Sequence, residues 1–127
     1  ALMWKSAGVI RCESGLSAAL KHLAASAPRI TVSTPAELIR RLEYENMRCV
    51  ARMVCRAALE RTESRGAHAR EDYPDRDDTN WRKHTLAWVD EAGKVKLDYR
   101  PVVTDPLTSF EDGGIDPKKI APKARVY

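Results

Sequence analysis

The sequence predicts a mainly α fold: a small three-helix bundle of the spectrin-like, up-and-down kind, followed by a β-hairpin and an extended C-terminal tail. Two observations predict the helices. Apolar residues recur at helical spacing before residue 25, and a helix start signal at Thr34 is followed by a long helical pattern. A third observation predicts the hairpin, since two strand-like runs flank a turn within 84–100. The length of 127 residues fits one domain.

The chain divides into four parts. We expect helices over 1–66, a charged loop over 67–83, the β-hairpin over 84–100 and the tail over 101–127. The sequence does not begin with Met, and a helical pattern starts at once, so we expect a piece of a longer protein.

The first two helices are short. The first covers residues 2–7 and is stopped by Gly8, and the second begins after Ser14, which we expect to cap it. The apolar positions of the second helix are Leu16, Ala19, Leu20 and Leu23. Pro28 ends this helix, because proline disfavours a helical conformation at the residue before it.

The third helix has the strongest signal. Thr34, Pro35 and Glu37 form a capping box with a favourable proline, and we expect the helix to run to about Glu63, with Gly66 as its stop. Its broad apolar face is typical of a bundle and comprises Leu38, Ile39, Leu42, Cys49, Val50, Met53, Val54 and Ala57. Asn46 falls within this face, where a buried amide bonded to a neighbouring helix is favoured over a catalytic amide.

One flank of the third helix carries a basic ridge formed by Arg48, Arg52 and Arg56 at i, i+4 spacing. Like charges at this spacing repel one another slightly. An acidic partner surface would neutralise the ridge and relieve that repulsion. We expect it to be a docking surface.

The charged loop gathers the side chains with the most reactive chemistry. Its candidate residues, taken together with Arg65 just before it, are His68, Arg70, Asp72, Arg76, Asp77 and Asp78. A histidine among arginines could perform acid–base chemistry on a dicarboxylate, because arginine forks onto carboxylates. The composition favours a self-neutralising loop that pins two elements together through Arg–Asp pairs. We therefore predict an interface here and no catalytic, cofactor-binding or metal-binding residue.

The hairpin has strands at Thr85–Val89 and Lys94–Tyr99 around a turn at Asp90–Gly93. The tail that follows is rich in proline, glycine and charge, so we expect it to lean on another surface.

Composition excludes several classes of function. The net charge of +4 is spread among interleaved acids, which argues against nucleic-acid binding, and no apolar run is long enough for membrane insertion. The sequence has no P-loop, GxGxxG or GxSxG motif. Three cysteines, Cys12, Cys49 and Cys55, match no zinc spacing with the histidines, so we expect reduced thiols.

Five segments together resemble a known family. They are Arg61–Pro74, with the run RTESRGAHAREDYP, then Glu45–Met47, Trp81–Leu86, Tyr99–Val102 and Pro122–Tyr127. Together with Lys94-Val95, and taken in chain order, they resemble the C-terminal region of succinate dehydrogenase and fumarate reductase flavoprotein subunits. The stretch Leu107–Ile120 departs from the commonest short ending of that family. L-aspartate oxidase, which has a similar Glu-Ser-Arg-Gly segment, and a free-standing helical interaction module are the alternatives.

The resemblance implies a helical domain that packs on the flavin and capping domains of the same protein and offers surface to an iron–sulphur subunit. The parent would oxidise succinate to fumarate and pass a hydride to covalent FAD, at the inner, cytoplasmic face of a membrane within a peripheral complex. The flavin and substrate residues of that family lie upstream, so we expect no cofactor in this chain and no activity from it alone.

Overall fold

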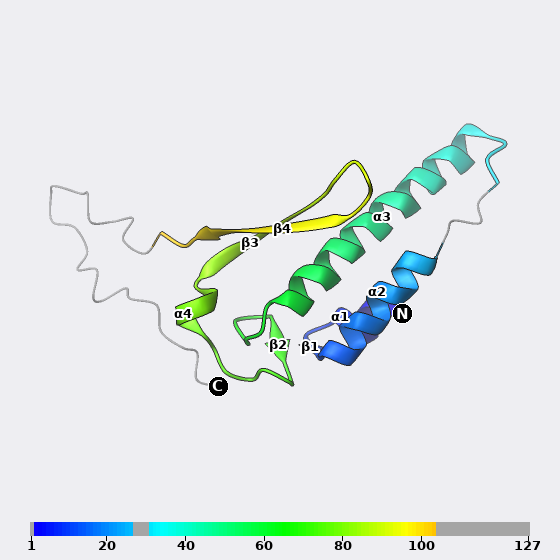
Figure 1. Ribbon diagram of the computed structural model, residues 1–127. Coiled ribbons are helices and arrows are strands. Elements are labelled where there is room, and N and C mark those ends of the chain that lie inside the picture. The colour runs from blue at the N-terminus through cyan, green and yellow to red at the C-terminus, as the bar shows by residue number, and fades with distance from the viewer. Residues whose placement is uncertain (1, 27–30, 104–127) are drawn as a thin grey trace, which may run out of the picture.

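A computed structural model describes residues 2–26 and 31–103, with two main helices and a hairpin (Figure 1). The elements in order are α1 (Leu2–Ala7), β1 (Ile10–Arg11), α2 (Glu13–Ala25), α3 (Pro35–Glu60), β2 (Ala69–Arg70), α4 (Asp78–Trp81), β3 (Lys83–Val89) and β4 (Val95–Pro101). The predicted helices and hairpin are therefore present. Most of the predicted tail, residues 104–127, lies outside the described residues.

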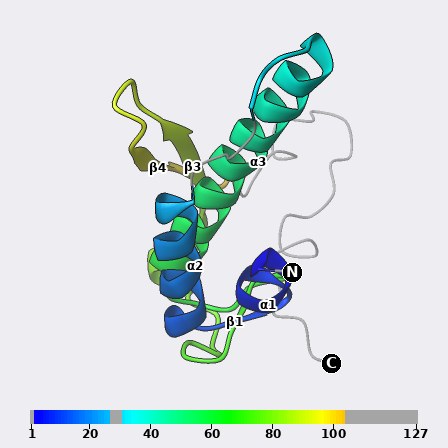
Figure 2. The same ribbon diagram turned by 90° about the vertical axis from the view of Figure 1, so that its right-hand side faces the viewer.

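The core lies where α2 packs against the second half of α3. Its buried members are Leu16, Ala19, Leu23, Cys55 and Ala58, and the short helix α1 packs beside them. In Figures 1 and 2, α2 and α3 run antiparallel with α1 across their lower end. The expected three-helix, up-and-down arrangement is not confirmed in this part of the chain, because α1 has only 6 residues.

The start of α3 follows the prediction. The Thr34 hydroxyl accepts from the Glu37 N–H at 3.3 Å, and the Glu37 carboxylate accepts from the Thr34 N–H at 2.8 Å, which completes the capping box. The two side chains thereby give hydrogen-bond partners to backbone N–H groups that have no partner within the helix.

Two predicted helix ends were wrong. α3 ends at Glu60 rather than near Glu63, and Gly66, with φ of 57°, lies in a turn closed by hydrogen bonds between Arg65 and His68. α2 begins at Glu13 after an extended Cys12, so Ser14 is not its cap. Both differences arise where tertiary contacts of the charged loop decide the backbone conformation.

Only part of the apolar face of α3 is covered. Arg48 donates to the Ser26 carbonyl oxygen at 2.7 Å, just past the end of α2, so the turns of α3 before Arg48 extend beyond α2 (Figure 1). On that exposed half, Ile39 is 57% and Leu42 is 50% exposed. Asn46 is also exposed, so the expectation of a buried amide was wrong.

The hairpin runs beside the second half of α3 (Figure 1). β3 and β4 pair antiparallel from Val89↔Val95 to Lys83↔Pro101, and the Asp90 N–H donates to the Lys94 carbonyl at 3.0 Å across the turn. Gly93 has φ of 74°, a conformation that favours glycine at this turn. The predicted hairpin is confirmed.

The predicted charged loop contains two short elements. β2 pairs in parallel with β1, through Ile10↔Ala69 and Arg11↔Arg70, and α4 follows an Asp77 cap. The β1–β2 pair fixes the loop to the N-terminal segment, beside the end of α3. The loop is thereby held against the core and positions the charged side chains described next.

Candidate functional site

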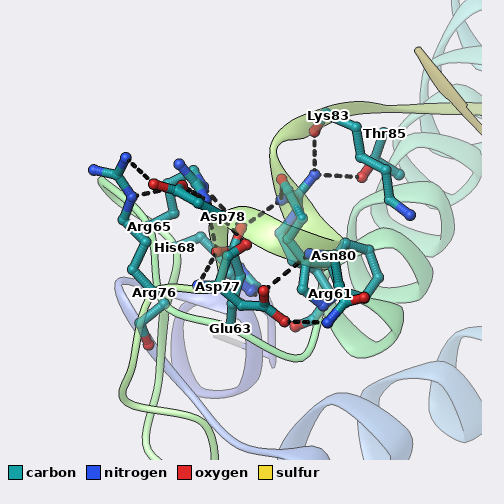
Figure 3. A network of polar contacts seen from close by, with 12 residues as sticks. Arg61, Glu63, Arg65, His68, Arg76, Asp77, Asp78, Asn80, Lys83 and Thr85 are labelled. Atoms are coloured by element: carbon teal, nitrogen blue, oxygen red, sulfur yellow. Dashed lines mark hydrogen bonds and ion pairs between the residues drawn. The ribbon is translucent and has the colours of Figure 1, made fainter. Parts of the chain in front are cut away.

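A cluster of alternating charges lies where the end of α3 meets α4 and β3 (Figure 3). We call it the Glu63 cluster; its members are Arg61, Glu63, Arg65, Arg76, Asp77 and Asp78. Four of these residues, Arg65, Arg76, Asp77 and Asp78, are predicted interface residues. The structure brings them together around a carboxylate that was not predicted.

Glu63 is the centre of the cluster and is 0% exposed. Its carboxylate accepts from Arg61 at 2.6 Å, from Arg65 at 2.8 and 3.0 Å, and from the Asp77 N–H at 2.9 Å. Burying a carboxylate costs several kcal/mol in lost hydration. Two arginines bound to the carboxylate supply a stabilisation on the order of that cost. Glu63 is therefore stable as an anion only while its arginines stay in place.

The protonation states follow from these contacts. Burial alone would raise the pKa of Glu63, but the bonds from Arg65, the Asp77 N–H and Arg61 hold it below its ordinary value. Arg76 and Arg65 lower the pKa of Asp78 strongly, and Glu63 and Asp78 raise the pKa of Arg65. All these groups are charged at neutral pH and bound to one another, an arrangement that stabilises structure.

Arg61 connects the cluster to the hairpin. Its guanidinium donates to the carbonyl oxygens of Trp81 at 2.9 Å and Lys83 at 2.6 Å, and to the Thr85 hydroxyl at 3.0 Å (Figure 3). It also stacks over the Trp81 ring, with 5.0 Å from Cζ to the ring centroid. A single residue just after α3 thus binds α4 and β3 to the helix.

A second ion pair, Arg70 with Asp72, fixes the other side of the loop. Arg70 is 2% exposed; its Nη1 donates to the carbonyl oxygens of Ala58 at 2.8 Å and Leu59 at 3.0 Å, which the helix end leaves without a partner. Nε and Nη2 bind both Asp72 oxygens at 2.7 Å.

Asp72 extends this pair to α2. Its Oδ2 accepts from the Glu13 N–H at 2.8 Å, at the first turn of α2. The hydrogen bonds of Arg70 lower the pKa of Asp72 strongly, and the Asp72 carboxylate raises that of Arg70. One ion pair therefore joins the end of α3 to the start of α2.

His68 lies between the two groups of charges and has both ring nitrogens engaged. Nδ1 is 2.9 Å from Arg11 Nη1, and Nε2 is 3.2 Å from the Arg61 carbonyl oxygen. Because arginine only donates, Nδ1 must accept, which assigns the proton to Nε2. Burial, helped by the charges of Arg11, Arg61 and Arg70, lowers the pKa of His68. The neutral ring therefore joins Arg11 to the Arg61 carbonyl oxygen, and both of its nitrogens are used in these two hydrogen bonds.

The predicted basic ridge on α3 lies apart from the Glu63 cluster. Arg48 donates to Ser26, Arg52 donates to the Gly93 carbonyl oxygen at 2.7 Å, and Arg56 pairs with Glu60 at 3.0 Å. Two of the three arginines therefore join α3 to its neighbours within the described chain. Docking of a partner on this ridge stays a prediction.

The described residues offer little for a bound metal or flavin. Among residues 2–26 and 31–103, no group of three His, Cys, Asp or Glu residues is placed to hold a metal ion. Cys12, Cys49 and Cys55 are free thiols, and burial raises the pKa of Cys55. Gly66 and Gly93 lie in tight turns rather than in a phosphate-binding loop before a helix.

In the described ranges, no helix is both long enough and apolar enough to cross a membrane.

The sequence prediction missed Glu63 and Arg61 as site residues. A signal was present, because Arg61, Glu63 and Arg65 place opposite charges at every second position directly after the end of α3. The prediction placed the helix through Glu63, which hid this pattern.

The chain is similar to several known proteins. The family model described as fumarate reductase flavoprotein C-term matches residues 1–127. A succinate dehydrogenase flavoprotein subunit of Rickettsia bellii is 52% identical over 91 residues, which cover 72% of this chain and 14% of the relative. A fumarate reductase flavoprotein subunit of Haemophilus influenzae is 53% identical over 53 residues, or 42% of this chain and 9% of the relative.

A solved structure of quinol fumarate reductase from E. coli superposes with a TM-score of 0.73 and 32% identity, covering 80% of this chain and 19% of that one. The chain thus spans only a small fraction of the length of the relatives it matches.

Proposed function

Because this chain belongs to the family of C-terminal domains of fumarate reductase and succinate dehydrogenase flavoprotein subunits, we propose that it is a structural domain that braces the flavin-carrying part of such a subunit. The parent would oxidise succinate to fumarate with hydride transfer to FAD, and fumarate reduction is the alternative direction. An iron–sulphur subunit would be a partner, within a complex at the inner face of a membrane.

One observation carries the structural role: the charged side chains of the loop are bound to one another around the buried Glu63 carboxylate. A residue that acts on substrate needs a group able to change its partners or its protonation during the reaction. Arg65 and His68 instead have their donors and acceptors committed to Glu63, Asp78, Arg11 and a carbonyl oxygen. This supports a brace over direct dicarboxylate binding by the loop.

The exposed half of α3 supports the same role. The first turns of α3 present Leu38, Ile39 and Leu42, each between 46% and 57% exposed. Exposed apolar patches of this kind mark interaction surfaces. We propose that another part of the subunit covers this half and completes the three-helix arrangement.

The proposed flavin chemistry lies outside this chain. When bound, FAD accepts the hydride; the residues described here supply no contact to it and contribute by holding a rigid surface. The docking residues we propose are the basic ridge, Arg48, Arg52 and Arg56, and the loop residues Arg65, His68, Arg70, Asp72, Arg76, Asp77 and Asp78.

Calorimetry tests this proposal directly. Titration of the purified chain with succinate, fumarate and malonate is expected to give no binding heat, and the preparation is expected to lack flavin absorbance. Titration with the flavin-carrying remainder of the subunit is expected to give a binding isotherm. Micromolar binding of a dicarboxylate, with no binding to the remainder, would establish the catalytic alternative.

A further inference from the structure

An open groove of about 440 Å³ lies between α2, the second half of α3 and the turn end of the hairpin (Figure 2). All three elements contribute to its lining, which comprises Leu20, Ala24, Arg52, Arg56, Lys94 and Val95. We call it the ridge groove, because two of its arginines belong to the basic ridge of α3. No member of the Glu63 cluster lines the groove, so its cations are not those that Glu63 and Asp78 neutralise.

The ridge groove keeps positive charge that the described residues leave unbalanced. Arg56 is neutralised by Glu60 at 3.0 Å, whereas Arg52 donates to the Gly93 carbonyl oxygen, at 2.7 Å, which carries no net charge. Within the described ranges, the ion pairs include none for Arg52 or Lys94. No carboxylate lines the groove. It therefore presents two cations to an incoming anion.

The hairpin turn holds this charge in position. Asp90, an acid of the turn, accepts from the Lys94 backbone N–H at 2.7 Å with one oxygen, and its other oxygen lies 3.6 Å from the Lys96 ammonium. The bond from Arg52 to Gly93 ties the same turn to α3. The Arg52 guanidinium and the backbone that carries Lys94 are thus ordered before a partner binds, which reduces the entropy that binding costs.

The remaining lining of the ridge groove is apolar and consists of Leu20, Ala24 and Val95. A purely apolar partner would bury Arg52 and Lys94 without a counter-charge, which is strongly unfavourable. A small dicarboxylate would pair with the cations but leave the apolar lining exposed to water. A peptide segment that carries a carboxylate beside an aliphatic side chain matches both parts of the lining.

We propose that the ridge groove receives an acidic segment of the flavin-carrying remainder of the subunit. Its carboxylates would pair with Arg52 and Lys94, and a neighbouring aliphatic side chain would contact Leu20 and Val95. This inference rests on the docking role proposed for the basic ridge and assigns that role to Arg52 together with Lys94, a residue outside the ridge. The remainder is the source because the chain covers only 14% of its Rickettsia bellii relative, so most of the subunit's surface lies outside the chain.

Carbodiimide crosslinking of the full-length subunit in its assembled complex tests the proposal. The reagent joins an amine to a carboxylate in contact with it and leaves no spacer between them. Lys94 is expected to be joined to an Asp or Glu outside residues 1–127, on a peptide with an aliphatic residue next to that acid. The link between Lys96 and Asp90, which lie 3.6 Å apart, serves as the internal positive control.

A pair of alanine variants shows whether the groove itself holds the partner. Ala24→Glu and Ala18→Glu each replace an exposed alanine of α2 and change the net charge equally, but only Ala24 lines the groove. Ala24→Glu places a carboxylate against that of the partner, so the yield of the Lys94 link is expected to fall by about tenfold or more. Ala18→Glu is expected to change this yield by less than about twofold, because an isolated exposed charge has a small effect.

Three results would overturn the proposal. The first is an assembled complex in which Lys96 is joined to Asp90 but Lys94 is joined to no carboxylate outside the chain; the bracing role, which the yield of assembled complex measures, would then still stand. The second is an equal yield of the Lys94 link in the Ala24→Glu and Ala18→Glu variants. The third is a link from Lys94 to the iron–sulphur subunit or to a second copy of the chain, which would assign the groove to a different partner.

Discussion

At the scale of single residues, the structure depends on a carboxylate that solvent does not reach. Glu63 is held by two arginines from the residues just after α3 and by the backbone N–H of Asp77, just before α4. The arginines themselves reach onward to Asp78, Trp81 and Lys83. Removing one charge therefore leaves several groups without their partners.

The variant Glu63→Gln measures that dependence. It keeps the size of the side chain but leaves Arg61 without its charge partner and Arg65 paired with Asp78 alone. We therefore expect a loss of about 3 kcal/mol in the free energy of unfolding, measured with urea. Glu60→Gln is the matched control, because Glu60 forms an exposed i, i+4 pair with Arg56; we expect its loss to stay below about 0.5 kcal/mol. Equal losses in the two variants would contradict a central role for Glu63.

The environment of His68 predicts that the stability of the chain depends on pH. Burial and the charges of Arg11, Arg61 and Arg70 lower its pKa in the folded chain, so the unfolded chain binds the proton more readily. Stability is then fully present above the unfolded pKa of about 6.5 and is lost as pH falls toward the lower folded pKa.

Urea midpoints measured from pH 7.5 to about pH 5 check this effect. His68→Gln is expected to show a flatter decline than the parent chain over this range. His22→Gln, which changes an exposed residue of α2, is expected to keep the parent decline. If His68→Gln and the parent chain declined in parallel, His68 would not be held neutral.

At the scale of elements, α3 has two halves with different surroundings. Its second half packs on α2 around Cys55 and Ala58, while its first half extends past the end of α2. The periodicity of the sequence marks the apolar face along the whole of α3. It does not distinguish the covered half from the exposed half, because it carries no information on where a neighbouring helix ends. The covered half is therefore the stable core of the chain, and the exposed half is available to a partner.

A pair of leucine variants tests this division. Leu16→Ala removes a side chain of α2 with 0% exposure and is expected to cost about 3 kcal/mol in the free energy of unfolding. Leu42→Ala removes a side chain that is 50% exposed and is expected to cost less than about 1 kcal/mol. A large loss for Leu42→Ala in the chain alone would show that the first half of α3 is covered by the chain itself.

The elements with strong local signals could be predicted from the sequence. The capping box fixes the start of α3, and the alternation around Asp90–Gly93 fixes the hairpin, because both depend on neighbouring residues. The end of α3 could not be predicted in the same way. Arg70 binds the last carbonyl groups of α3 from a position 12 residues after Ala58, and that contact exists only once the loop has folded back.

The candidate site was predictable in composition but not in arrangement. The loop was expected to hold arginines and aspartates in mutual pairs, and Arg65–Asp78, Arg76–Asp78 and Arg70–Asp72 are such pairs. The buried partner, Glu63, was missed because it was placed on α3. The role of Arg61 depends on carbonyl oxygens of α4 and β3, which sequence spacing does not bring near it.

At the scale of the whole molecule, the chain presents two kinds of surface. One is the exposed apolar half of α3, and the other is charged and comprises the Glu63 cluster and the ridge groove. The charged residues of the cluster are bound to one another, and the described residues leave the first half of α3 uncovered. This combination is typical of a domain that packs against the rest of a larger protein. The proposed bracing role accounts for both surfaces.

The full-length subunit carrying Arg65→Ala gives the most direct test of this role. Arg65 binds Glu63 and Asp78, while Arg41→Ala, which removes an exposed partner of Glu45, is the matched control. Two quantities are measured: the yield of assembled complex, and the turnover of succinate per bound flavin in the complex that does assemble. We expect Arg65→Ala to lower the yield while turnover per flavin stays that of the parent protein. A normal yield with full flavin content and lost turnover would contradict the bracing role and assign Arg65 to the reaction.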